Sequence, residues 1–205
     1  MSQRRRLTVV LVLNLAMIAG LVVVGFSAHS LGVLAAGGDY VADSAAIALG
    51  ILAVTIRQRV GEQSKAPTVV AGINATALLV VSALVLVAGV RRLVQGTPDV
   101  QGLPVLVVST VATVVMLIGV VVLGADSGSE DLHMRSVLLD TVSDAVASAA
   151  VAVSGLVIYL TGRLQWLDSA LSVLIALVIG AGALHLLRDV AVALRTGSAL
   201  DLDDD

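Results

Sequence analysis

The segment SLGVLAAGGDYVADSAAIALGILAV, residues 30–54, has the length and composition of a helix that crosses a membrane. Such a helix needs about 20 apolar residues to span the hydrocarbon core. Its only charged residues are Asp39 and Asp43. One aspartate at the centre of a membrane helix costs on the order of 2.5–3.5 kcal/mol on insertion scales, so two in one helix indicate a function.

The same spacing returns in DTVSD, residues 140–144, which places Asp140 and Asp144 in a second apolar segment. Residues four apart project from one face of a helix. At a rise of 1.5 Å per residue, the first pair lies roughly 12–18 Å from one face of the membrane and the second roughly 9–15 Å from the other. Both pairs therefore approach the middle of the core, where four carboxylates can converge if the two helices pack together.

The whole chain has the composition of a membrane protein. Of its 205 residues, 58% are hydrophobic and 13% are charged, and the mean hydropathy is +1.05. A soluble domain carries about 25% charged residues. The absence of cysteine excludes disulfides and thiolate metal sites. The few aromatic residues and the lack of a basic patch argue against a nucleic-acid partner.

Breaks rich in glycine, proline and charge divide the chain into six apolar segments. We predict an all-α membrane protein in which residues 1–205 form a single transmembrane domain, with residues 196–205 as a short acidic cytoplasmic tail. With both termini in the cytoplasm, nine of the 12 basic residues fall on the inner side, as the positive-inside rule requires. The expected location is the inner or plasma membrane. The six predicted transmembrane helices are about 7–28, 31–56, 68–90, 103–124, 134–161 and 167–193.

Four carboxylates at one depth can bind a divalent cation. Mutual repulsion keeps part of such a cluster protonated when it is empty, and a bound cation displaces those protons. Competition between metal and protons at one site is the physical basis of an exchanger. Two alternatives remain: aspartates with purely structural hydrogen bonds, and an intramembrane aspartyl protease. The protease pattern GxGD is matched neither by AGGD around Asp39 nor by LLDTVSD around Asp140.

Three stretches resemble the cation diffusion facilitator family. Residues 30–54 resemble its second helix, typically SLALLADAxHxxxD, and GLPVLVVSTVATVVML, residues 102–117, resembles its fourth. Residues 131–179 resemble its fifth and sixth helices, with an (H/D)xxxD motif and a W-x-D turn. The resemblance implies a six-helix transporter, not an enzyme, that expels divalent cations with the inward proton gradient and carries no prosthetic group. It also implies the metal ligands: Asp39 and Asp43 as the first pair, Asp140 and Asp144 as the second.

The sequence departs from the family pattern in three respects. Aspartate replaces histidine at 39 and 140, and an all-carboxylate site favours Mn²⁺ or Fe²⁺ over Zn²⁺ or Cd²⁺, although carboxylates also bind zinc. We therefore expect Zn²⁺ or Mn²⁺ as cargo, with Fe²⁺, Co²⁺ and Cd²⁺ as further candidates. Ala36 stands where many members have an acidic residue. The chain ends at Asp205, so we expect a short form without the family's cytoplasmic domain. In that form any homodimer rests on the membrane helices, and a transport-inactive, partner-dependent subunit is the alternative function.

Other polar residues have weaker predicted roles. Asn14 and Asn74, in the first and third helices, are candidates to orient the aspartates, although interhelical hydrogen bonding is an alternative role for both. The mouth of the fifth helix carries a cluster that could attract cations: Glu130, Asp131 and His133.

Asp168 follows Trp166 where the sixth helix is predicted to begin. We interpret the aspartate as the N-cap of that helix and the tryptophan as an anchor at the membrane interface.

Overall fold

The computed structural model describes residues 3–42, 44–45, 66–125 and 132–196, and over these residues the regular structure is helical with no strand. The prediction of an all-α fold is confirmed. Asp43 and the acidic tail are among the predicted features that lie outside the described residues. The helices are α1 (Gln3–Ser27), α3 (Ala66–Gln95), α4 (Gly102–Ala125), α5 (Leu132–Thr161) and α6 (Trp166–Thr196), and a further helical segment runs over Leu31–Ala42.

Local sequence explains where these helices begin and end. The Ser30 hydroxyl accepts a hydrogen bond of 3.1 Å from the backbone N–H of Val33, which is the geometry of an N-cap. Helices α3 and α5 end just before Gly96 and Gly162, whose φ angles are +110° and +59°. Glycine adopts this left-handed conformation without the steric cost that a Cβ atom brings, so both glycines stop their helices.

Helix α3 is longer than the range predicted from the sequence. It extends to Gln95, so Arg91 and Arg92 lie in its last turns and not in a loop. No glycine or proline occurs between Val90 and Gly96, and the helix therefore continues through the two arginines. The Arg92 guanidinium turns back and donates a 2.6 Å hydrogen bond to the carbonyl oxygen of His29.

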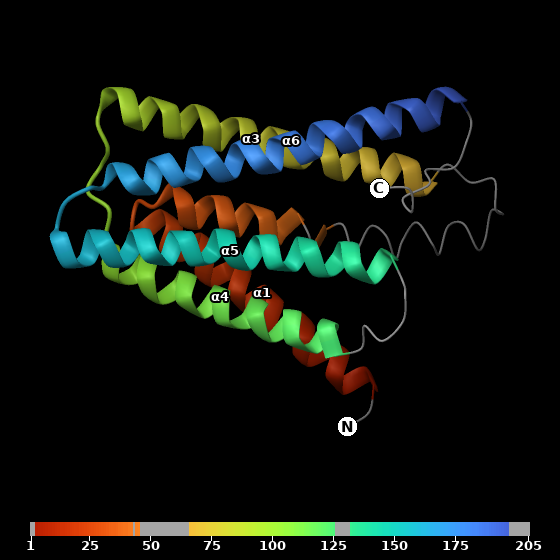
Figure 1. Cartoon of the computed structure of the whole chain (residues 1–205), viewed down its shortest axis with the longest axis horizontal. Coiled ribbons are helices and arrows are strands. Elements are labelled where there is room, and N and C mark those ends of the chain that lie inside the picture. The colour runs from red at the N-terminus through yellow and green to blue at the C-terminus, as the bar shows by residue number, and fades with distance from the viewer. Residues whose placement is uncertain (1–2, 43, 46–65, 126–131, 197–205) are drawn as a thin grey trace.

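The helices form two closely packed pairs, α3 with α6 and α4 with α5 (Figure 1). Smaller contacts join α1 to α4 and α5 to α6. Small residues allow the close approach within a pair, as is common between membrane helices. A Cβ atom on Gly155 of α5 would come within 2.7 Å of the backbone nitrogen of Leu106 on α4. Successive helices alternate in direction, so α1 begins and α6 ends at the same end of the bundle (Figure 1).

Segment Leu31–Ala42, named here the central segment, packs between the two pairs. Its glycines lie against three different helices: Gly32 against Val151 of α5, Gly37 against Leu21 of α1, and Gly38 against Val81 of α3. The same Gly32 also lies against Asp168 of α6. The absence of side chains at these positions lets one helix contact four neighbours, which places much of the central segment inside the bundle.

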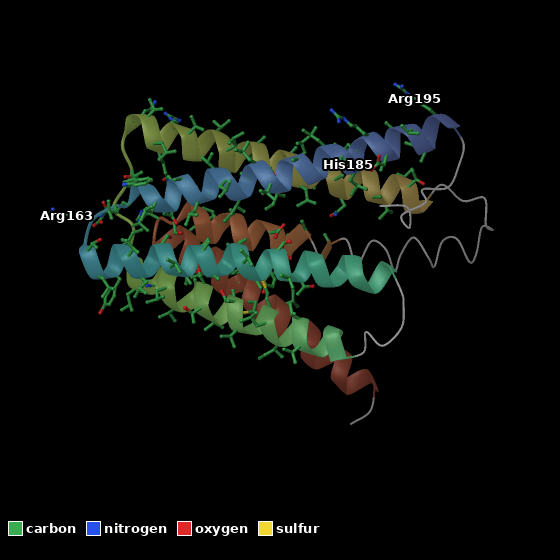
Figure 2. The ribbon with its side chains drawn as sticks, in the orientation of Figure 1. Arg163, His185 and Arg195 are labelled. Atoms are coloured by element: carbon green, nitrogen blue, oxygen red, sulfur yellow. The ribbon has the colours of Figure 1, made fainter. Side chains whose placement is uncertain are left out.

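The outside of the bundle is apolar. Large hydrophobic side chains such as Phe26, Leu84 and Leu160 are exposed there, while Arg163 and Arg195 lie at opposite ends of the molecule (Figure 2). Exposed apolar surface on this scale is rare on soluble monomers. Among the described residues, three helices are long and apolar enough to cross a membrane: Thr68–Gln95, Thr141–Thr161 and Trp166–Arg195. The chain is an integral membrane protein.

Candidate metal site

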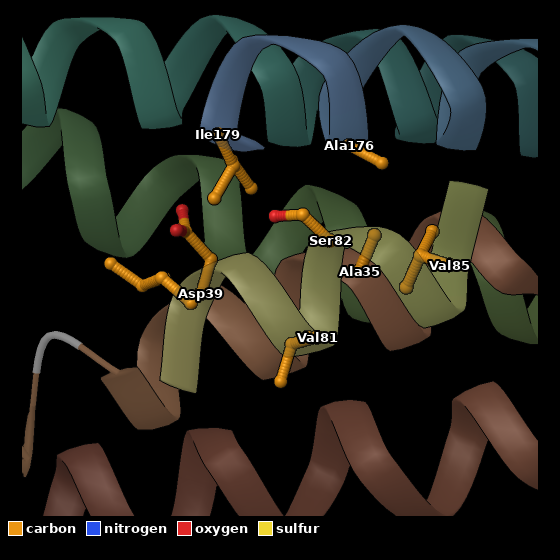
Figure 3. A pocket seen from close by; sticks show the side chains of 8 residues that line it. Ala35, Asp39, Val81, Ser82, Val85, Ala176 and Ile179 are labelled. Carbon is orange, nitrogen blue, oxygen red and sulfur yellow. The ribbon is translucent and has the colours of Figure 1, made fainter. Parts of the chain in front are cut away.

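Asp39 lies in the interior of the bundle, on the central segment. It is half-buried and lines a small cavity of about 10 Å³ between that segment, α3 and α6. Apolar side chains form most of the wall, including Leu78 and Val81 of α3 and Ile179 of α6. The carboxylate points toward the side of α6 that carries Ile179 (Figure 3). A carboxylate in such surroundings needs polar partners or a cation to offset its desolvation.

Asp144 is half-buried on α5, beside the buried Ala145. Its position relative to Asp39 follows from the contact between Gly32 and Val151. Asp39 follows Gly32 by seven residues, and Asp144 precedes Val151 by seven. Seven residues make about two helical turns and a rise of roughly 10 Å, which returns a side chain to nearly the same face. Because the two helices run in opposite directions (Figure 1), both aspartates lie at about the same level of the bundle.

The other two predicted ligands are not described in the same detail. Asp43 lies outside the described residues, and Asp140 belongs to α5 but its side chain is not described. Among the side chains that are described, no group of three or more His, Asp or Glu could hold a metal ion. The convergence of all four aspartates therefore stays a prediction, supported by the register of the two that can be placed.

The structure also describes only some of the residues with weaker predicted roles. Glu130 and Asp131 lie outside the described residues, and for His133 and Asn14 only the helical backbone is described. Asn74 is half-buried on α3 and precedes Leu78 by one helical turn. Since Leu78 lines the Asp39 cavity, Asn74 lies on the same side of α3 as the site.

Asp168 has a different role from the one predicted. It lies in the first turn of α6, is fully buried, and accepts hydrogen bonds from the central segment. The donors are the Ser30 hydroxyl at 2.5 Å, the Leu31 N–H at 2.8 Å and the Gly32 N–H at 3.2 Å. Asp168 therefore caps the helix that carries Asp39 and not its own. The prediction of a self-cap was wrong, because sequence distance gives no sign of a partner 138 residues away.

Further hydrogen bonds join the turns at this end of the bundle. Arg92 of α3 bonds to the His29 carbonyl, and the Gln101 N–H donates a 3.1 Å bond to the Ala28 carbonyl. The Gln165 side chain donates a 3.0 Å bond to Asp99. These contacts and the Asp168 cap attach the start of the central segment to α3, α4 and α6. The attachment determines the position of Asp39 along the bundle.

Comparison with known proteins identifies the family. Residues 7–194 match the family described as the cation efflux transmembrane domain. This chain belongs to the cation efflux family. The match covers α1 to α6 and includes both aspartate pairs, in agreement with the resemblance found in the sequence.

Members of the cation efflux family similar to this chain include named metal transporters. The zinc transporter ZitB of Escherichia coli (strain K12) is 29% identical over 191 residues, which cover 89% of this chain and 59% of that protein. ZitB of Yersinia pestis is 26% identical, covering 98% and 66%. The cadmium, cobalt and zinc/H(+)-K(+) antiporter of Bacillus subtilis (strain 168) is 22% identical, covering 95% and 65%. The chain thus spans 59–66% of the length of these relatives.

Proposed function

We propose that this protein transports divalent transition-metal ions out of the cell in exchange for protons, by alternating access. Asp39, Asp43, Asp140 and Asp144 are the proposed ligands of the metal in transit and the acceptors of the counter-transported protons. In this proposal the metal ion is cargo, and the chain is a transporter and not an intramembrane protease, in line with the cation efflux domain that it matches.

The observation that carries the proposal is the shared register of Asp39 and Asp144. Both lie about two helical turns from the same interhelical contact, between Gly32 and Val151, in the same direction along the bundle (Figure 1). In the sequence, Asp43 and Asp140 stand four residues from Asp39 and Asp144, which is the spacing of about one helical turn. Four carboxylates near one point repel each other, so either a divalent cation or protons must neutralise them. Metal and protons then compete for one site.

The ligand chemistry and the relatives both bear on which metal we propose as cargo. The relatives named above carry zinc, cadmium and cobalt in their names. Carboxylate oxygens alone form a harder ligand set than one containing histidine, which shifts preference toward Mn²⁺ and Fe²⁺. We therefore propose Zn²⁺ or Mn²⁺ as the cargo. The same proposal places both termini in the cytoplasm, because the basic residues concentrate on that side.

The test is metal uptake into proteoliposomes that contain the purified chain. Mn²⁺, Fe²⁺, Zn²⁺ and Cd²⁺ are compared with and without an imposed pH gradient, and Asp144→Asn is the matched site variant because it removes one charge with almost no change in volume. We expect flux that is driven by the gradient and absent in Asp144→Asn. The order of rates then assigns the metal.

Two results would change the proposal. Binding of metal without flux for any of the four ions would favour the alternative, a subunit that needs a partner to transport. Normal flux in Asp144→Asn would show that the carboxylates are not the transport site.

A further inference from the structure

A second polar group shares the cavity with Asp39. Ser82 of α3 is about 95% buried, since only 5% of its surface is exposed, and its hydroxyl lines the same wall as Asp39. Among the described residues this hydroxyl has no hydrogen-bond partner. The rest of the cavity wall is aliphatic: Ala35, Leu78, Val81, Val85, Ala176 and Ile179. The Ser82 oxygen is turned toward the side where the Asp39 carboxylate lies (Figure 3).

The size of the cavity defines what can fill it. Its volume of about 10 Å³ is close to the smallest space that holds one water molecule, and a buried water needs at least two polar partners. The Ser82 hydroxyl and the Asp39 carboxylate are two such partners. A hydroxyl left without a hydrogen bond in apolar surroundings costs about 1–3 kcal/mol, which favours occupation of the space by water.

We propose that Ser82 is a positioning residue for metal binding, which holds one water molecule against the Asp39 carboxylate from the side of α3 and α6. The inference rests on the proposed function, because it takes Asp39 as a ligand. By donating a hydrogen bond to one carboxylate oxygen, the water fixes the orientation in which Asp39 meets the metal. A group that orients a metal ligand in this way typically contributes 10–100-fold to metal affinity.

The bundle also contains a matched control. Ser109 of α4 is buried to the same degree, at 2% exposed, and its hydroxyl likewise has no partner among the described residues. Ser109 does not line the Asp39 cavity. Changing either serine to alanine removes one buried hydroxyl from a membrane helix, but only Ser82→Ala removes it from the wall of the Asp39 cavity.

The experiment measures equilibrium binding of Mn²⁺ and Zn²⁺ to the purified full chain in detergent. We expect Ser82→Ala to raise the dissociation constant roughly tenfold, while Ser109→Ala changes it less than about twofold. In an Asp39→Asn background, Ser82→Ala should add less than about twofold, because a residue that acts through a carboxylate has no effect once that carboxylate is gone.

The outcomes separate this inference from the proposed function. If wild-type chain binds metal and Asp144→Asn does not, but Ser82→Ala behaves like Ser109→Ala, the role of Ser82 is overturned and the transport site stands. A tenfold effect of Ser82→Ala that persists in the Asp39→Asn background also overturns it, since the serine would then act elsewhere. Wild-type chain that binds neither metal would overturn the proposed function itself.

Discussion

Removal of the Asp168 carboxylate should destabilise the bundle more than the loss of any other acidic side chain whose contacts the structure describes. In Asp168→Ala, the Ser30 hydroxyl and the N–H groups of Leu31 and Gly32 all lose their acceptor in a buried place. A hydrogen bond to a charged group contributes about 1.5–3 kcal/mol. The three are not additive, because Ser30 still caps Val33 and water can reach part of the space left by the side chain.

The expected loss is therefore about 3–5 kcal/mol, the usual cost of breaking a buried charged network by removing one partner. For a chain of this size, 1 kcal/mol corresponds to about 2–4 °C in Tm, so Tm should fall by roughly 10 °C. The only tryptophan, Trp166, lies two residues before Asp168 and is half-exposed. Its fluorescence during a thermal scan in detergent reports unfolding close to the altered residue.

Asp189→Ala is the matched control. Asp189 also lies on α6, but its side chain is 44% exposed and it pairs with His185, one helical turn away, at 3.0 Å. Exposed ion pairs contribute about 0–1 kcal/mol, so this variant should unfold within a few degrees of wild type. Equal Tm values for the two variants would refute the argument that Asp168 anchors the central segment.

Three further outcomes follow from the packing and the site. Asp144→Asn should abolish metal flux in proteoliposomes with Tm within about 2 °C of wild type, and loss of folding would instead indicate a structural role. Gly155→Leu should lower Tm, because a Cβ there meets the Leu106 backbone at 2.7 Å and overpacking costs about 1–3 kcal/mol; Gly182→Ala, with open space around it, should not. Arg92→Gln should cost about 1 kcal/mol through its lost bond to His29, less than Asp168→Ala in the same thermal scan.

The fold could be predicted from the sequence because it depends on local patterns. Long apolar stretches separated by glycine, proline and charge predict helices and loops, and α1, α3, α4, α5 and α6 occupy five of these stretches. The end predicted for the second helix lies outside the described residues. The extension of α3 to Gln95 shows the limit of this reasoning. The charges of Arg91 and Arg92 predict a loop, yet a helix end at the membrane surface accepts arginine well.

The candidate site could be predicted only in part. Intramembrane aspartates can be recognised in a sequence because placing a charged side chain in the membrane costs free energy whatever its neighbours are. Ser82 and Asp168 could not be recognised in the same way. A serine is common in membrane helices, and an aspartate at the start of a helix has an ordinary local role as a cap. Their importance comes from neighbours in other helices, Asp39 for Ser82 and Ser30 for Asp168, which only the packed bundle reveals.

The hydrogen bonds to Asp168 also hold the central segment at one end. The fixed point is at Leu31 and Gly32, and Asp39 lies seven residues further along, roughly 10 Å from it. A tilt of about 10° around that point displaces Asp39 by roughly 2 Å at this arm length. That is about the length of a bond between a carboxylate oxygen and Zn²⁺. A small rotation of this helix about its attachment to α6 is therefore enough to form or break a contact between Asp39 and the proposed metal ion.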